Sequence, residues 1–274
     1  TSTFQLLSIL KLSLRKSTPW YLLVFLLTSI MAWLPLAPVL RAFGNGWVIQ
    51  DFLSSQTLNI LGNTVVLATK ASALAVGLGL PLAILATRTN VFGHRLLRLC
   101  IPLPLFLPPL LLAQAWHGFS GADSSLMAAI CLGFAYAPLP ALFAARALRR
   151  QSPSSHQAAL LAGGPKGALK EMLRLALPGA CLGTAFAFLF IASDFAVPDY
   201  FATVGDKFSV YAGKVFYQFR DQNWNQGTRA AAPLLALGLF ILGLAWLVDW
   251  KFGNPQGGKI NTPQRLKLQE WNPF

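Results

Sequence analysis

Few residues in this chain combine a reactive side chain with a spacing that catalysis or metal binding needs. The histidines, His94, His117 and His156, are far apart in the sequence, and no pair is expected to face each other as metal or haem ligands. The three cysteines show no Cys-x-x-Cys spacing, so they indicate neither a zinc site nor a disulfide framework. No glycine-rich phosphate loop is present, so this chain is not expected to hydrolyse ATP on its own. The sequence predicts no catalytic residue, metal ligand or cofactor.

Two ionisable residues occupy positions that membrane transport can use. Lys70 lies within a long apolar run, and Asp194 comes at the end of another. Ionisable residues inside a membrane segment commonly line a substrate or ion pathway. Lys70 is therefore a candidate pathway residue, with Asp194 as its candidate partner. The alternative is that the four-carbon stem of Lys70 carries the ammonium to the membrane interface, which gives it no role in transport.

The composition shows which elements must position these residues. The chain has 274 residues, of which 55% are hydrophobic and 11% are charged, and its mean hydropathy is +0.54. About a quarter of the residues of a typical soluble domain are charged. The high apolar and low charged content therefore excludes a soluble enzyme, a disordered chain and a disulfide scaffold. A spanning helix needs about 20 mainly apolar residues, and six runs reach that length with their flanks. They are Trp20–Leu40, Thr64–Ala86, Leu99–Trp116, Leu126–Leu148, Gly179–Ala192 and Ala230–Val248. We therefore expect an all-α, polytopic membrane bundle of six transmembrane helices.

The distribution of basic residues predicts the orientation of this bundle. The net charge is +13, and cytoplasmic segments of membrane proteins are enriched in Lys and Arg. With a cytoplasmic N-terminus, sixteen Lys and Arg lie in inside segments and five in outside segments, and both termini are then cytoplasmic. The outside five are Arg41, Lys207, Lys214, Arg220 and Arg229. Because the basic residues are spread over four inside segments, a nucleic-acid partner is not expected.

The runs and their flanks also predict the domain organisation. Residues 1–19 form an N-terminal cytoplasmic or interfacial segment, residues 20–250 form the six-span domain, and residues 251–274 form a polar, basic cytoplasmic tail. The run at 20–40 is too long for the apolar part of a signal peptide, so we expect it to remain as a span.

The longest cytoplasmic loop, residues 149–178, differs in pattern from the other connections. A helix is predicted through Gln157-Ala158-Ala159 and is stopped by Gly163-Gly164-Pro165. A second helical stretch, Lys166–Leu177, is predicted to end at Pro178, just before the fifth span. The first helix has the small and apolar residues that fit a groove of a partner protein. An ordinary helical loop on the inner surface is the alternative.

This loop resembles the cytoplasmic EAA loop of importer-type ABC transporter permeases. The family pattern is Glu-Ala-Ala, three residues, Gly, and then Leu-Pro at the next span; here Gln157-Ala158-Ala159, Gly163 and Leu177-Pro178 correspond to it. Asn63-Thr64 at the start of the second span and Leu80–Ala83 leading to Arg88 also fit. The segment 193–201 is similar to the ferric-iron, polyamine and thiamine branch. Two departures are that Gln157 replaces Glu and that Leu177-Pro178 comes one or two residues late.

The resemblance implies a function and a set of partners. The chain would be the permease subunit of an ATP-driven importer in the bacterial inner membrane, and not itself an enzyme. Its partners would be an ABC ATPase dimer that binds ATP and Mg, a second permease domain (the same chain or a similar half), and a periplasmic or lipoprotein substrate-binding protein. The ATPase-coupling residues would be Gln157, Ala158, Ala159, Gly163, Gly164 and Pro178. Ferric iron is the implied cargo, and polyamine, thiamine or sulfate are the alternatives.

The outer segment Asp194–Arg229 mixes aromatic and charged residues. With Lys70 and Asp194, its residues Asp199 and Tyr200 are candidates for the pathway or for an outer gate that the binding protein contacts. The alternative is a re-entrant or interfacial segment packed on the bundle. A stand-alone secondary transporter or channel is the competing function for the whole chain, and a polar set at mid-membrane would favour it.

Overall fold

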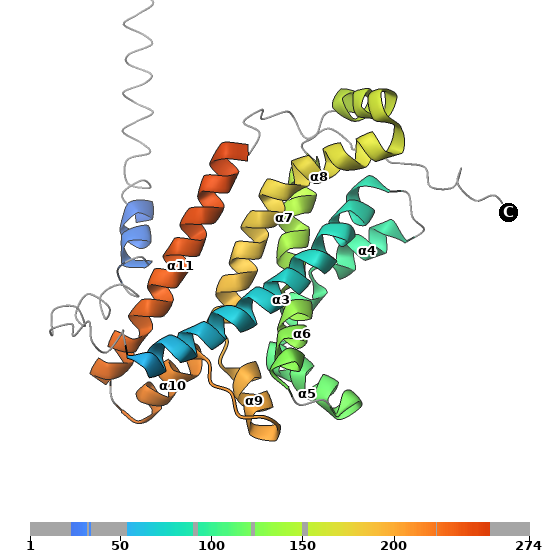
Figure 1. Cartoon of the computed structure of the whole chain (residues 1–274). Helices are drawn as coiled ribbons and strands as arrows, with labels where there is room; N and C mark the ends of the chain where they lie inside the picture. Colours follow the sequence, from blue (N-terminus) through green and yellow to red (C-terminus); the bar gives the residue numbers. More distant parts are fainter. Residues whose placement is uncertain are drawn as a thin grey trace, which may run out of the picture.

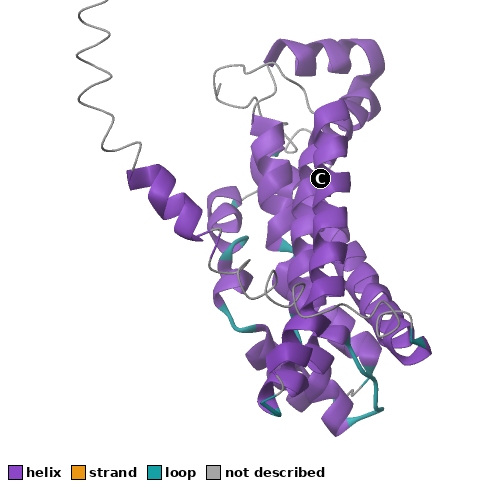
Figure 2. Ribbon diagram, turned by 90° about the vertical axis from the view of Figure 1, so that its left-hand side faces the viewer, coloured by secondary structure: helices purple, strands orange, loops and turns teal. Residues whose placement is uncertain are grey.

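Helices make up nearly all of the chain that the computed structural model describes, which comprises residues 23–31, 33, 54–89, 93–121, 124–149, 153–222 and 224–252. No β-strand occurs among these residues (Figure 2). The elements are α3 (Ser55–Arg88), α4 (His94–Cys100), the 3₁₀ helix η1 (Leu103–Phe106), α5 (Pro109–Ser120), α6 (Ser125–Tyr136), α7 (Pro138–Arg149), α8 (Pro153–Ser193), α9 (Ala196–Val204), α10 (Tyr211–Arg220) and α11 (Trp224–Phe252). Residues 23–31 and 33 are also helical. The predicted all-α fold class is confirmed.

Four helices in the described ranges are long and apolar enough to cross a membrane. They are α3, α6 together with α7, α8 from Gln157 to Ser193, and α11 from Trp224 to Val248. They contain the predicted second, fourth, fifth and sixth spans. The first predicted span, 20–40, lies mostly outside the described residues, as do the segment 1–19 and nearly all of the tail 251–274. The helical membrane bundle is therefore confirmed, and the count of six spans stays a prediction.

Three of these helices, α3, α6 with α7, and α11, run toward one end of the bundle and α8 runs away from it, so that the basic segments share that end (Figure 1). At this end α3, α7 and α11 finish, α8 begins and α4 lies. At the opposite end α3 and α11 begin, and α5, α9 and α10 lie there. We call these the inner end and the outer end. The enrichment of Lys and Arg predicts that the inner end faces the cytoplasm.

The third predicted span, Leu99–Trp116, is not one straight helix, and its crossing as a single span stays a prediction. Its residues are divided among α4, η1 and α5, and the two halves are bent by 97° across the break. Four prolines lie at the break: Pro102, Pro104, Pro108 and Pro109. Proline lacks the backbone N–H and its ring clashes with the preceding turn, so this density of prolines turns the chain. The pair is a broken span or a re-entrant segment.

The fifth span is longer than predicted, because the helix does not end at Pro178. From Pro165 the helix α8 continues through Pro178 to Ser193. Proline leaves the carbonyl of Arg174 without its helical donor. Arg174 is exposed at the inner end, and a freed carbonyl costs little where water can reach it. One continuous helix therefore joins the cytoplasmic loop to the outer end.

The centre of the bundle is held by close contact of α7 with α3 on one side and α8 on the other. A Cβ atom added to Gly79 of α3 would lie 2.6 Å from the carbonyl oxygen of Ala137. One added to Gly183 of α8 would lie 2.6 Å from the Cα atom of Pro140. In lipid, helices associate by van der Waals contact more than by hydrophobic exclusion, and small residues permit that contact. Alanines dominate the buried residues around it.

Two arginines brace the inner end of the same helices. Arg88 at the end of α3 is fully buried and donates from Nη2 to the carbonyl oxygen of Leu148 in the last turn of α7. Arg98 of α4 donates from Nη2 to the carbonyl oxygen of Ala86, at 3.1 Å, near the end of α3. The last carbonyls of a helix lack helical donors and carry partial negative charge, so cations are favoured there. The two guanidinium groups thereby tie α3 to α7 and α4 to α3.

The contact at Gly79 can be tested with a single methyl group. We expect Gly79→Ala to lower the free energy of unfolding by about 1–3 kcal/mol, because backbone atoms of α7 must move. The matched control is Gly77→Ala on the same helix, where a Cβ would meet nothing within 4 Å. That change should be neutral or stabilise by about 0.5–1 kcal/mol through helix propensity. Thermal unfolding of the detergent-solubilised protein measures both. Equal effects of the two changes would contradict the close contact.

Candidate functional site

The inner end carries a helical hairpin formed by the start of α8. Residues 153–163 form a short helix that stops at Gly164, whose φ is 60° and ψ is −156°. That backbone conformation is accessible almost only to glycine. The predicted helix stop at Gly163-Gly164-Pro165 is therefore confirmed, and Gly164 is the residue that makes it. Figure 1 shows the short helix folded over the inner end of α8.

The two arms of this hairpin touch at a glycine that the sequence interpretation overlooked. A Cβ atom added to Gly167 would lie 2.8 Å from the carbonyl oxygen of Ala159. A side chain at position 167 would push the short helix away from the long one. Three of the predicted coupling residues of the hairpin are exposed: Gln157, Ala158 and Gly163.

The hairpin leaves a large apolar side chain uncovered. Leu161 is 90% exposed, and a Cβ atom added to the neighbouring Gly163 would meet nothing within 4 Å. Isolated exposed leucines are ordinary on a protein surface. Here, though, the leucine lies on a short, exposed helix of small residues at the basic end, which is the shape of a helix that docks in a groove. Pro178, the last predicted coupling residue, is buried and belongs to the long arm, fourteen residues beyond the turn at Gly164.

At the outer end, α9 and α10 form a second candidate surface, which we call the outer platform. Asp194 shapes its first turn, because its Oδ1 accepts a hydrogen bond from the backbone N–H of Val197 at 3.1 Å. Burial raises the pKa of the Asp194 carboxyl, and hydrogen bonds from the backbone of Val197 and Ala196 oppose that rise. Asp194 has no ion pair with Lys70, and its described contacts give it a structural role at the α8–α9 turn.

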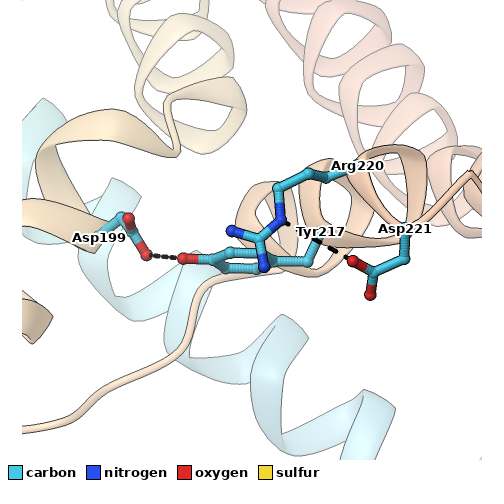
Figure 3. Close-up of polar contacts among 4 residues, drawn as sticks. All are labelled: Asp199, Tyr217, Arg220 and Asp221. Carbon is cyan, nitrogen blue, oxygen red and sulfur yellow. Dashed lines mark hydrogen bonds and ion pairs between the residues drawn. The ribbon is translucent and has the colours of Figure 1, made fainter.

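Asp199 joins the two helices of the platform, as Figure 3 shows. Its Oδ1 accepts a hydrogen bond from the hydroxyl of Tyr217 at 2.5 Å. Beside this bond, Phe195 stacks on Phe216 with ring centroids 4.1 Å apart. The guanidinium of Arg220 lies 4.8 Å from the ring centroid of Tyr217. Its Nε is also 3.8 Å from Oδ1 of Asp221, in an ion pair that is mostly exposed and so contributes little to stability.

The platform is attached to the bundle through buried hydrogen bonds to α3. The backbone N–H of Tyr211 donates to Oγ1 of Thr64 at 2.7 Å, and both residues are almost fully buried. Nζ of Lys214 donates to Oγ1 of Thr57 at 2.8 Å. On the α9 side, the rings of Tyr200 and His117 meet edge to face at 5.8 Å between centroids. Tyr200 therefore packs against α5.

The structure brings together some of the predicted outer residues and separates others. Asp194, Asp199 and Tyr200 lie on the platform or its first turn. Lys70 is exposed on the surface of α3, fifteen residues into a helix that starts at Ser55 and not at Thr64 as predicted. Within the described ranges, no group of three or more His, Cys, Asp or Glu residues is placed to hold a metal ion.

Sequence interpretation missed the residues that hold the platform in place. Thr57, Thr64, Tyr211 and Lys214 connect segments about 150 positions apart. Tyr217 joins α10 to Asp199 of α9. Asn63-Thr64 drew attention as a family-like pair at a span start, and Asn63 also donates, from Nδ2, to the carbonyl oxygen of Ser209 at 3.4 Å. That pair was the one available signal. The partners of that pair, Ser209 and Tyr211, carry no spacing that points to α3.

Comparison with known proteins places this arrangement among transport proteins. The sequence profile described as "Binding-protein-dependent transport system inner membrane component" matches residues 75–252. No curated protein matches the chain in sequence. In fold, the chain is similar to a chain of a bacterial alginate ABC transporter in complex with an alginate-pentasaccharide-bound periplasmic protein, with a TM-score of 0.62 and 14% identity over 87% of this chain and 96% of that chain.

A second solved structure gives the same result. It is a bacterial ABC transporter involved in the import of the acidic polysaccharide alginate, with a TM-score of 0.58 and 14% identity over 89% of this chain and 99% of that chain. At this level of identity the likeness shows the fold alone. It gives no support to ferric iron as the cargo.

The hydrogen bond between Asp199 and Tyr217 makes a testable prediction about the pKa of the Tyr217 hydroxyl. Because Asp199 accepts a hydrogen bond from the phenol and its charge opposes ionisation, the pKa of Tyr217 is raised, with Arg220 acting in the opposite direction. We expect Asp199→Ala to lower the pKa of Tyr217 toward its ordinary value. A ¹³C-tyrosine NMR titration measures it, with Tyr217→Phe identifying the resonance. Asp206→Ala, on the exposed loop after α9, is the control. If Asp199→Ala left the pKa of Tyr217 unchanged, the hydrogen bond would be contradicted.

Proposed function

The chain belongs to the family of binding-protein-dependent transport system inner membrane components, and from that premise we propose that it is the membrane-spanning permease subunit of an ATP-driven ABC importer. The subunit carries solute from a binding protein at the outer end to the cytoplasm. Hydrolysis of ATP, with its Mg ion, takes place in a separate ATPase dimer. The family places the chain in an inner membrane, which for a bacterium is the cytoplasmic membrane.

The observation that carries this proposal is the hairpin at the inner end. Its short helix is exposed, presents Leu161, and is joined to α8 by a single glycine turn. A small, exposed amphipathic helix suits a groove on a partner protein. Docking of this helix into the ATPase would bury Leu161 and the small residues around it, Ala158 and Gly163. Gln157 would offer a neutral hydrogen bond where the family motif has a carboxylate.

The long arm of the hairpin supplies the mechanical connection. From Pro165 to Ser193, α8 runs without a break from the inner end to the first turn of the outer platform. It packs on α7 through Gly183, so a displacement of the hairpin moves α7 and α8 together. When ATP closes the ATPase dimer, it pulls two such hairpins toward each other. The two permease domains then tilt from an inward-facing to an outward-facing arrangement.

The outer platform is the surface on which a binding protein would dock. It is rich in aromatic residues and contains Arg220, and aromatic residues and arginine are enriched in protein–protein interfaces. Its hydrogen bonds to α3 would transmit the arrangement of the bundle to the docked protein. The binding protein, periplasmic or lipid-anchored, would release solute between two permease domains. The second domain is another copy of this chain or a similar half.

A stand-alone secondary transporter or channel is the competing function. It would couple transport to ions through titratable side chains inside the bundle. Lys70, the candidate for that role, is exposed on α3 and forms no ion pair with Asp194. Family membership and the hairpin both favour the importer subunit.

Ferric iron is the cargo to test first. This choice of cargo rests on the resemblance of residues 193–201 alone. Polyamine, thiamine and sulfate are the other candidates of that resemblance. The alginate transporters share the fold at 14% identity, and their cargo is an acidic polysaccharide. The platform and its loops hold Asp199, Asp206 and Asp221 against Lys207, Lys214 and Arg220, so their charges favour neither a cationic nor an anionic cargo.

The docking of the hairpin can be tested at Leu161. We expect Leu161→Glu to weaken ATPase binding about thirtyfold, the effect of losing an interface anchor worth about 2 kcal/mol. Co-purification of the ATPase in mild detergent and ATP-dependent uptake measure the loss. Gly163→Glu should act in the same direction without disturbing the fold, because the space around it is open.

The matched control for Leu161→Glu is Phe119→Glu on α5. Phe119 is also 90% exposed, but it lies at the outer end. We expect this variant to retain the ATPase. Retention of the ATPase by both Leu161→Glu and Gly163→Glu would remove the basis of the proposal, and transport in liposomes without ATP would favour the secondary transporter.

The cargo can be identified from the binding protein that co-purifies with the permease. We expect native mass spectrometry of that protein to show the mass of a ferric ion or ferric complex, and an iron chelator to return it to the mass of the free protein. A bound polyamine, thiamine, sulfate or acidic oligosaccharide would exclude iron. That outcome would leave the assignment of the permease subunit unchanged.

A further inference from the structure

An apolar groove runs between α8 and α11 in the inner half of the bundle. Its volume is about 650 Å³. Leucines of α8 spaced four residues apart form one wall, and α11 closes the other side through Val248. The lining residues are Lys166, Leu169, Lys170, Leu173, Arg174, Leu177, Pro178, Cys181 and Val248.

The inner part of the groove is bordered by three cations on one face of α8. Lys166, Lys170 and Arg174 are spaced at four-residue intervals, so they form a stripe along the helix. All three are exposed, and among the described residues none has an ion pair. Like charges at this spacing repel each other and destabilise a helix. An anion beside the stripe would convert that repulsion into attraction.

The stripe and the apolar wall lie at different depths in a membrane. At 1.5 Å per residue, Arg174 is about 28 Å along the axis from Ser193 at the outer end of α8. The hydrocarbon core is about 30 Å thick, which places Arg174 at its inner boundary and Lys166 and Lys170 among the headgroups. Leu177, Cys181 and Val248 then lie in the inner leaflet. On α11, Trp246 and Trp250 are 64% and 74% exposed, as is typical of aromatic residues at the interface.

From these positions we propose that the α8–α11 groove is a binding site for an anionic phospholipid of the inner leaflet. The phosphate of the headgroup pairs with Lys170 and Arg174, and Lys166 is the cation nearest the cytoplasm. One acyl chain lies along Leu173 and Leu177 toward Val248. A free phosphate would meet the same cations but would leave the apolar wall uncovered, so the groove favours the lipid. This site is independent of the proposed transport function.

The site can be tested with the full-length protein purified from membranes in mild detergent, together with the subunits that co-purify. The probe is phosphatidylglycerol, compared with phosphatidylcholine of the same chain length, and retention is measured by native mass spectrometry. We expect the wild-type protein to retain phosphatidylglycerol selectively. Lys170→Gln with Arg174→Gln should lower retention about thirtyfold, given the effect expected of two cations near a lipid surface.

Two further variants separate this site from a general effect of charge. Arg146→Gln with Arg149→Gln removes the same charge from the inner end of α7, away from the groove, and should leave retention unchanged. Val248→Trp keeps the cations but fills the apolar wall, and should lower retention of phosphatidylglycerol. An excess of inorganic phosphate should not displace the lipid.

Several outcomes would overturn the proposal. One is an equal loss in the two double variants, which would mean that net charge alone attracts the lipid. Others are full retention by Val248→Trp, or displacement of the lipid by inorganic phosphate. Absence of anionic lipid from the assembled complex would show that a protein partner covers the groove. The readout is lipid binding, so a failure of the proposed transport function would not affect it.

Discussion

The close backbone contact of α7 with α3 and α8 is the constraint on which the other features depend. Gly79 on α3 and Gly183 on α8 face the same short stretch at the start of α7, from Ala137, the residue before it, to Ala141. In a membrane, such contact replaces the hydrophobic exclusion that holds a soluble core together. The outer platform is bonded to α3, and the hairpin is an extension of α8. The contact therefore sets the distance and orientation between the two candidate surfaces.

This arrangement indicates where movement can occur in a transport cycle. A packed interface of backbones and small side chains has little freedom to slide, because any shift produces overlap or a void. The turn at Gly164 interrupts α8 at the inner end, and the proline-rich break separates α4 at the inner end from α5 at the outer end. We therefore expect α3, α7 and α8 to move as one body. Alternation of access would then come from tilting of whole permease domains against each other.

Apolar runs and basic flanks were sufficient to predict the fold class. They did not predict where helices bend or continue, because that depends on how the prolines are placed. The prolines near Pro104 and Pro108 break a helix, while Pro178 lies inside a continuous one. The difference lies in their surroundings: consecutive prolines remove several donors in one turn, whereas a single proline at the interface frees one carbonyl near water. At the candidate site, the local pattern Gly163-Gly164-Pro165 correctly predicted the end of the short helix. The bond between Thr64 and Tyr211 joins distant segments, and neither residue signals the other in the sequence.

The net charge of +13 acquires its physical meaning from the places where the cations lie. Arg88 and Arg98 are used inside the bundle, where they satisfy the carbonyls at helix ends. Lys166, Lys170 and Arg174 form a solvent-facing stripe without counter-ions among the described residues. Both groups lie at the same end, so both contribute to the same orientation in the membrane. Composition alone could not distinguish them, since a buried brace and a surface stripe count equally in a net charge. A strongly basic membrane protein therefore needs no nucleic-acid partner to explain its charge: part of it closes the helices, and part of it faces the headgroups.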